Sequence, residues 1–163
     1  MDVDLIPTLF DQLRETVEGP PKDGWCWITD GKPGSELFGT LNALTPQQAF
    51  ASPAAGAKSI AAHVEHLRFT FDVTVERLAG KDPRPDWAGS FVIADTSPIA
   101  WEIQKRELRR AYDAMLAGFE LFRSKPIQDW PPIVAVGLVA QIGHTAYHLA
   151  AIRQIAQVVR HGE

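Results

Sequence analysis

The sequence contains one cysteine, Cys26, and no sustained alternation of β-branched and polar residues. A single cysteine excludes an internal disulfide and a zinc site built from cysteines. Because the alternation is missing, we expect little or no sheet. The N-terminal segment MDVDLIPTLF lacks the basic and apolar regions of a secretory signal. We therefore expect a cytoplasmic protein.

The sequence also lacks an excess of positive charge. Its formal net charge is -4 and its pI is about 5.7, so no basic field attracts a phosphate backbone. We expect a small-molecule partner, no nucleic acid and no membrane. The apolar stretch 133–152 contains Gln141, His144 and His148, which are costly in hydrocarbon. This stretch favours a buried core helix over a membrane span.

The composition that remains is that of an ordinary globular protein. The 163 residues, 45% of them apolar, predict a single domain over residues 1–163 with its own core. Helical spacing of apolar residues predicts four long helices. They cover residues 3–18, residues 60–79 after the N-cap Ser59, a segment that starts at Pro98 after the N-cap Ser97, and a segment that follows Pro131 and Pro132 and ends at about Arg160. The expected fold is an all-α four-helix bundle.

A long connection, residues 19–58, separates the first two helices. Its first part is rich in Gly and Pro and should be irregular. Its later part predicts local helix: Ser35 can cap a short segment through Leu44, and Thr45, Pro46 and Gln48 form a capping-box pattern. Long connections in compact domains are often functional.

Four tryptophans lie in predicted connections. Large apolar rings in such places either plug the ends of a bundle or line a substrate mouth, and we favour plugs. For two of them, the pair that flanks Cys26, we also consider a role in shaping a pocket. The tryptophans are Trp25, Trp27, Trp87 and Trp130.

Four of the five histidines fall into two pairs on predicted helices. His144 and His148 are four residues apart, which on an α-helix places them one turn apart on nearly the same line. His63 and His66 both lie within the apolar arc of the second long helix. Up to four imidazoles thus point into the bundle interior. Three neutral imidazoles with an open position form a catalytic divalent-metal site, and a buried polar network is the alternative.

The residues around these histidines resemble the DinB/YfiT-like superfamily of metal-binding four-helix proteins. The resemblance rests on the segments SIAAHVEHL (residues 59–67), HTAYHLAAIRQ (residues 144–154) and ELFGTL (residues 36–41). In that superfamily one histidine in a motif ending His-Leu and two in a His-x-x-x-His motif bind a divalent metal, usually zinc or nickel. The matching positions are His66, His144 and His148.

The resemblance implies a bundle of the DinB/YfiT-like type, frequently a homodimer. Characterised relatives include S-transferases and isomerases that use bacillithiol, mycothiol or glutathione, so a thiol cosubstrate is one expectation. His63 has no counterpart among the three ligands. We interpret it as a group outside the ligand set that orients a bound water or hydrogen-bonds a ligand, or as a base.

The last helix carries further candidates. Gln141 and Tyr147 are the residues of this helix that can reach a bound ligand, with ordinary packing as the alternative. A second stripe of small and apolar residues runs along another side of the helix. A helix that is apolar on two sides usually has a neighbour beyond its own core, so we expect this stripe in a two-fold homodimer interface. The stripe is Val139, Gly143, Ala146 and Ala150.

Two functional hypotheses follow from these patterns. The first is a metal-dependent enzyme acting on a small molecule, which the resemblance extends to transfer of a low-molecular-weight thiol. The second is a non-enzymatic, stress-associated dimer that binds a metal or ligand. Structural metal sites are saturated by protein ligands and catalytic ones keep an open position. The role of His63 therefore decides between the two.

Overall fold

The computed structural model describes residues 5–21 and 25–161, and the regular elements among these residues are helices, with no strand. The long helices are α1 (Leu5–Glu18), α4 (Ile60–Leu78), α5 (Pro98–Glu120) and α6 (Pro132–His161). Shorter elements are α2 (Leu37–Asn42), α3 (Pro46–Phe50) and the 3₁₀ turns η1 (Gly89–Phe91) and η2 (Ile127–Asp129). The all-α prediction is confirmed. Val3, the expected start of the first helix, lies outside the described residues.

The helices begin where their capping residues predict. The Oγ atoms of Ser59 and Ser97 accept hydrogen bonds from the backbone N–H groups of Ala62 and Ala100, at 3.2 and 3.1 Å. Each bond satisfies one of the free N–H groups of a first helical turn. At the end of α4, Gly80 has φ +78°, a left-handed conformation that glycine adopts without strain.

Two details of the long connection differ in their outcome. Thr45 forms the expected capping box with Gln48 at the start of α3. The prediction that Ser35 caps the helix that follows it, α2, is wrong, because Glu36 occupies the N-cap position of α2 without a side-chain bond. The Ser35 hydroxyl donates instead to the carbonyl of Lys32 at 2.7 Å, within the turn that precedes α2.

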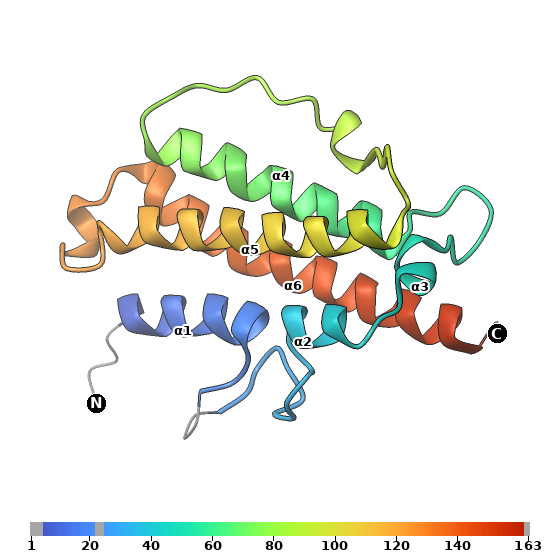
Figure 1. Cartoon of the computed structure of the whole chain (residues 1–163). Helices are drawn as coiled ribbons and strands as arrows, with labels where there is room; N and C mark the ends of the chain where they lie inside the picture. The colour runs from blue at the N-terminus through green and yellow to red at the C-terminus, as the bar shows by residue number, and fades with distance from the viewer. Residues whose placement is uncertain (1–4, 22–24, 162–163) are drawn as a thin grey trace.

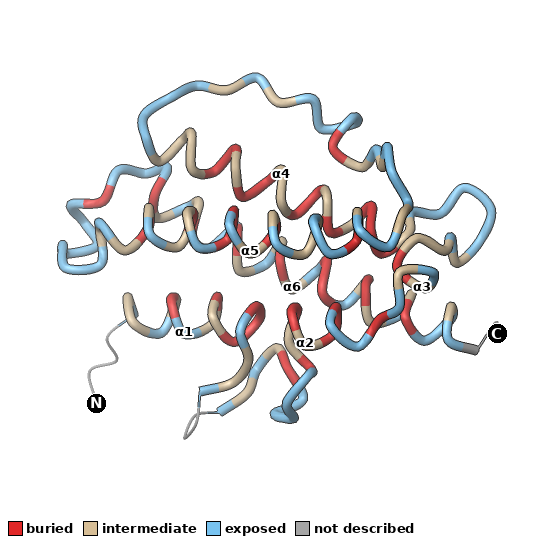
Figure 2. Tube along the Cα trace, viewed as in Figure 1, coloured by how far each residue is buried: buried red, intermediate tan, exposed pale blue. Residues whose placement is uncertain are grey.

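The core lies between the long helices. Helix α4 packs against both α5 and α6, and α1 covers α6 from the other side (Figure 1). Buried positions follow the inner sides of these helices (Figure 2). The five largest fully buried side chains come from α1, α4 and α5 and are Trp101, Tyr112, Phe10, Phe71 and Phe119. This packing fixes the distance between α4 and α6, the two helices that carry the paired histidines.

Helix α6 buries only one of its two apolar sides in the monomer. Val134, Leu138, Leu149 and Ile152 lie in the core, while Val139 is 55% exposed. Gly143 and Ala150 of the predicted stripe are also exposed, and Ala146 is half-buried. One apolar side of α6 therefore faces the core of the single chain, and the predicted stripe lies on another side. The stripe is a solvent-facing apolar surface.

By length and composition, residues Pro132–Arg160 could cross a membrane, with a mean hydropathy of 1.3. About a third of the residues in this apolar window are buried, at 33%. A single such helix is weak evidence, because core helices of soluble proteins share the same length and composition. Imidazoles in the middle of the helix also carry a cost in hydrocarbon.

The expectation that the four tryptophans plug the ends of the core holds for one of them. Trp130 is buried and donates from Nε1 to the carbonyl of Lys125 at 3.0 Å, so it closes one end of the core as a plug. Trp25 and Trp27 are 85% and 77% exposed, and Trp87 is 43% exposed. The plug prediction is therefore wrong for these three.

Candidate metal centre

His144 and His148 lie one turn apart on α6 and point the same way. Their Nε2 atoms are 3.0 Å apart, as expected for residues at i and i+4 whose rings turn toward each other. His148 is buried and His144 is half-buried. The sequence prediction that this pair faces the bundle interior is confirmed for both residues.

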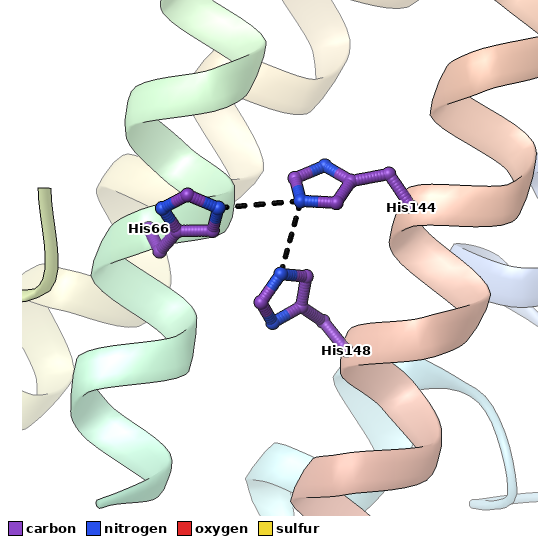
Figure 3. Close-up of side chains that lie close together, drawn as sticks. All are labelled: His66, His144 and His148. Carbon is purple, nitrogen blue, oxygen red and sulfur yellow. Dashed lines mark hydrogen bonds between the residues drawn. The ribbon is translucent and has the colours of Figure 1, made fainter. Parts of the chain in front are cut away.

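His66 approaches the pair from α4. Its Nε2 lies 3.2 Å from Nε2 of His144, so three ring nitrogens from two helices meet at one point (Figure 3). One nitrogen from each of His66, His144 and His148 lies within 4.8 Å of the other two. The group could therefore hold a divalent ion.

The spacing of these nitrogens fits a tetrahedral ion. Two nitrogens bound at about 2.0–2.1 Å to one tetrahedral zinc are roughly 3.3–3.4 Å apart. The observed separations of 3.0 and 3.2 Å are close to that value. The donor set, three imidazoles, suits zinc, nickel, iron or copper better than magnesium or calcium.

The electrostatics of the site keep the imidazoles neutral. Burial, followed by the neighbouring histidines, lowers the pKa of His66 to about 4 and that of His148 to about 3. Burial also lowers the pKa of His144, and burial together with Lys58 lowers that of His63. Near neutral pH all four rings are uncharged, which is the form that binds a metal.

His63 lies behind His148 and outside the three converging nitrogens. The Nδ1 atoms of His63 and His148 are 2.9 Å apart, so one ring donates a proton to the other. Nδ1 of His148 is on the far side of the ring from the Nε2 that meets His144. His63 thus contacts a candidate ligand and is absent from the group of converging ligand atoms.

The connection between α4 and α5 forms one wall of the site. Phe91 stacks on the ring of His66, with centroids 4.0 Å apart and planes 7° from parallel. Trp87 meets the same ring edge-on at 6.3 Å. Ser90 lies between them with its Oγ 2.6 Å from Nδ1 of His66. Sequence reasoning missed this wall, and the only signal for it was the run of apolar residues around Trp87 in a predicted connection.

The remaining sequence candidates occupy different places. Gln141 is buried and donates from Nε2 to Oγ1 of Thr74 at 2.7 Å, so it ties α6 to α4 one turn from His144. Tyr147 is 66% exposed and its ring meets His148 edge-on at 5.0 Å. Tyr147 is therefore at the rim of the site, whereas Gln141 takes part in helix packing.

The predicted pocket tryptophans lie elsewhere. Among the described residues, the non-histidine rings that contact the four histidines belong to Phe91, Trp87 and Tyr147. Trp25 and Trp27 belong to the loop after α1, where the backbone N–H of Trp27 donates to Glu15 at 2.9 Å. The tryptophan at the site is Trp87, which sequence reasoning assigned to a plug.

Together, fold and site define a class: an all-α protein in which two helices bring three histidines to a candidate metal site. A family model described as the DinB superfamily matches residues 32–152, which is more than half of the chain. The chain belongs to the DinB superfamily. The matched region contains all four clustered histidines. Searches of curated proteins and of solved structures found no match.

Proposed function

We propose that this protein binds one divalent metal ion, zinc or nickel, through Nε2 of His66, His144 and His148. The observation that carries the proposal is the convergence of these three nitrogens from α4 and α6. Their low pKa values support it, because neutral imidazoles do not compete with protons for the ion. The ligand set is the one that membership in the DinB superfamily also suggests.

We further propose that the protein is a metal-dependent enzyme acting on a small molecule. Three protein ligands leave a tetrahedral ion an open position, as in catalytic sites. The placement of His63 supports this, because its Nδ1 is directed at His148 and leaves the ligand set at three. A closed site with four histidine ligands would favour the non-enzymatic metal-binding dimer instead.

The proposed reaction is transfer of a low-molecular-weight thiol, and the resemblance to thiol-using relatives is its support. A divalent ion would supply a Lewis acid that lowers the pKa of a coordinated thiol. The chain's own contribution is to hold three imidazoles in place and to shield them. Phe91 and Trp87 cover His66, while half-buried His144 and exposed Tyr147 leave the other side accessible.

The experiment that tests the metal site is elemental analysis of untagged protein purified without chelators. We expect about one ion per chain in the wild-type protein and loss of that ion in His66→Ala and His148→Ala. His161→Ala, which changes the fifth histidine, is the matched control and should keep the ion. No binding after reconstitution with zinc and with nickel would overturn the metal site.

The reaction is tested on the metal-loaded protein with glutathione and an alkyl halide. In the proposed step a C–S bond forms at the carbon, and halide and a proton are released. We expect thiol consumption above the rate without protein, and the background rate with His148→Ala. If a panel of thiols and electrophiles gives only background rates with fully loaded protein, thiol transfer is rejected and the metal site stands.

We also propose a two-fold homodimer formed through the exposed stripe of α6. Val139, Gly143 and Ala150 are exposed on this helix, and a Cβ added at Gly143 meets no atom within 4 Å. An apolar helix surface that contains a glycine allows a second helix to approach closely. Separately, we keep the cytoplasmic location expected from the sequence as a proposal.

A further inference from the structure

Ser90 lies in the η1 turn, outside both helices that carry the candidate ligands. It is buried, at 4% exposure, and its Oγ makes two contacts of 2.6 Å, one with Nδ1 of His66 and one with the carbonyl oxygen of Trp87. A serine hydroxyl has one proton to donate and can accept further bonds. The carbonyl of Trp87 can only accept, so the hydroxyl proton is directed to it.

This pattern fixes the proton on His66. Because the Ser90 hydroxyl gives its proton to Trp87, it can only accept at the contact with His66, and Nδ1 of His66 must carry the N–H. A neutral imidazole has a single ring proton. Nε2 of His66 therefore carries a lone pair, and this lone pair is directed at the point where the three nitrogens meet.

Ser90 also selects between the two orientations of the ring. Phe91 stacks within 7° of the plane of His66 and so fixes that plane. A half-turn of the ring about its Cβ–Cγ bond leaves the ring in the same plane, so it would keep the stack, and it would exchange each nitrogen with a carbon position. Hydrogen-bond partners distinguish the two orientations, and Ser90 at Nδ1 is the partner that comes from outside the histidine group.

We propose that Ser90 is a positioning residue of the metal centre: it holds His66 in the Nδ1–H tautomer and in the ring orientation that presents Nε2 to the ion. This inference rests on the proposed function for the role of the ion. Partners that hold the outer nitrogen of a ligating histidine typically change metal affinity 10–100-fold when removed.

Two readouts test the inference. In metal-free protein, the ¹⁵N and ¹H correlations of the His66 ring should show the Nδ1–H tautomer in the wild type and a mixture of tautomers in Ser90→Ala. The zinc dissociation constant, measured by competition with a chromophoric chelator, should rise about 10-fold or more in Ser90→Ala. Ser90→Thr keeps the hydroxyl and should restore both readouts toward wild type.

Asp86→Ala is the matched control for a merely structural role. Asp86 accepts from the N–H of Gly89 at 3.0 Å and so stabilises the same turn through a bond that does not involve His66. The Asp86→Ala variant should have a slightly lower thermal stability, and its His66 tautomer and zinc affinity should be the same as in the wild type. Equal losses of zinc affinity in Asp86→Ala and Ser90→Ala would overturn the inference, because the turn rather than the hydroxyl would then position His66.

The outcomes also separate the inference from the proposed function. Wild-type protein that binds no zinc would overturn the metal site. The tautomer of His66 in Ser90→Ala would then be the readout that decides whether Ser90 positions His66. Zinc binding in the wild type with unchanged affinity and tautomer in folded Ser90→Ala would overturn the inference and leave the metal site intact.

Discussion

Nδ1 of His63 in α4 lies 2.9 Å from Nδ1 of His148 in α6. The contact joins two histidines that are far apart in the sequence and belong to the two different pairs. It lies on the outer side of His148, because the Nε2 of that ring meets His144 at 3.0 Å. His63 thus has the geometry of a residue that orients a ligand.

The first prediction concerns this contact. His63→Ala should lower zinc affinity about 10-fold while the protein still binds one ion per chain, because the three converging nitrogens remain. His148→Ala should abolish binding. Stoichiometry and the dissociation constant are measured by chelator competition. Loss of the ion in folded His63→Ala would show that His63 is itself a ligand and would favour the closed, structural site.

The second prediction is a pH dependence of stability in metal-free protein. The pKa values of His66 and His148 are about 4 and about 3 in the folded chain, and both rise to about 6.5 on unfolding. Between these values the unfolded chain binds more protons than the folded one. The free energy of unfolding should therefore fall as the pH is lowered from about 6.5 to about 4.

Urea unfolding at a series of pH values measures this effect. The double variant His66→Ala, His148→Ala should show a shallower slope over the same interval, because neither group titrates. Zinc should raise the free energy of unfolding without reducing this slope, because the bound imidazoles of the folded chain stay unprotonated while those of the unfolded chain still titrate. A wild-type slope no steeper than that of the double variant would contradict the pKa assignment.

The third prediction concerns the anchor of the long connection. Glu15 in α1 is 1% exposed and accepts from the backbone N–H groups of Trp27, Ile28 and Thr29 and from the Thr29 hydroxyl. Burial raises the pKa of this carboxyl, but the three backbone N–H bonds outweigh it, so the pKa lies below its usual value. The loop is thus held by a buried carboxylate.

Glu15→Ala should destabilise the protein by about 2–4 kcal/mol, since it leaves three backbone N–H groups, including that of buried Thr29, and the Thr29 hydroxyl without their acceptor. Glu76→Ala, which removes a carboxylate 3.7 Å from Lys81 on the surface, should change stability by less than about 1 kcal/mol. Chemical denaturation measures both. Zinc affinity should be the same in the two variants, because neither carboxylate contacts the four clustered histidines. Equal stability of the two variants would refute the anchoring role of Glu15.

The fourth prediction concerns the apolar stripe of α6. Sedimentation at micromolar concentration should give about twice the 18.0 kDa chain mass. Gly143→Arg should give monomers with unchanged helicity, because a Cβ at this position meets open space in the single chain. Ile99→Arg, at a 73% exposed position of α5, is the control and should stay dimeric. A wild-type monomer of 18 kDa would refute the dimer.

Helix boundaries were predictable because capping is local. Ser59, Ser97 with Pro98, and Thr45 with Gln48 act on N–H groups within three residues of themselves, so their effect is visible in the sequence. The failure at Ser35 has the same local origin. Its hydroxyl bonds to the carbonyl of Lys32, three residues before it, instead of capping the helix that follows.

The sequence by itself determined the all-α fold, the long helices and the inward direction of both histidine pairs, because helical periodicity places apolar residues and imidazoles on one side. It also identified His66, His144 and His148 as one group through the family resemblance. These properties depend on spacing along single helices.

Only the tertiary structure decided what surrounds that group. Packing of α4 against α6 places His63 behind His148, and the fold of the α4–α5 connection brings Ser90, Phe91 and Trp87 onto His66. It also leaves Trp25 and Trp27 on the surface. The path of an irregular connection is set by contacts with distant residues, and no periodicity in its own sequence encodes those contacts.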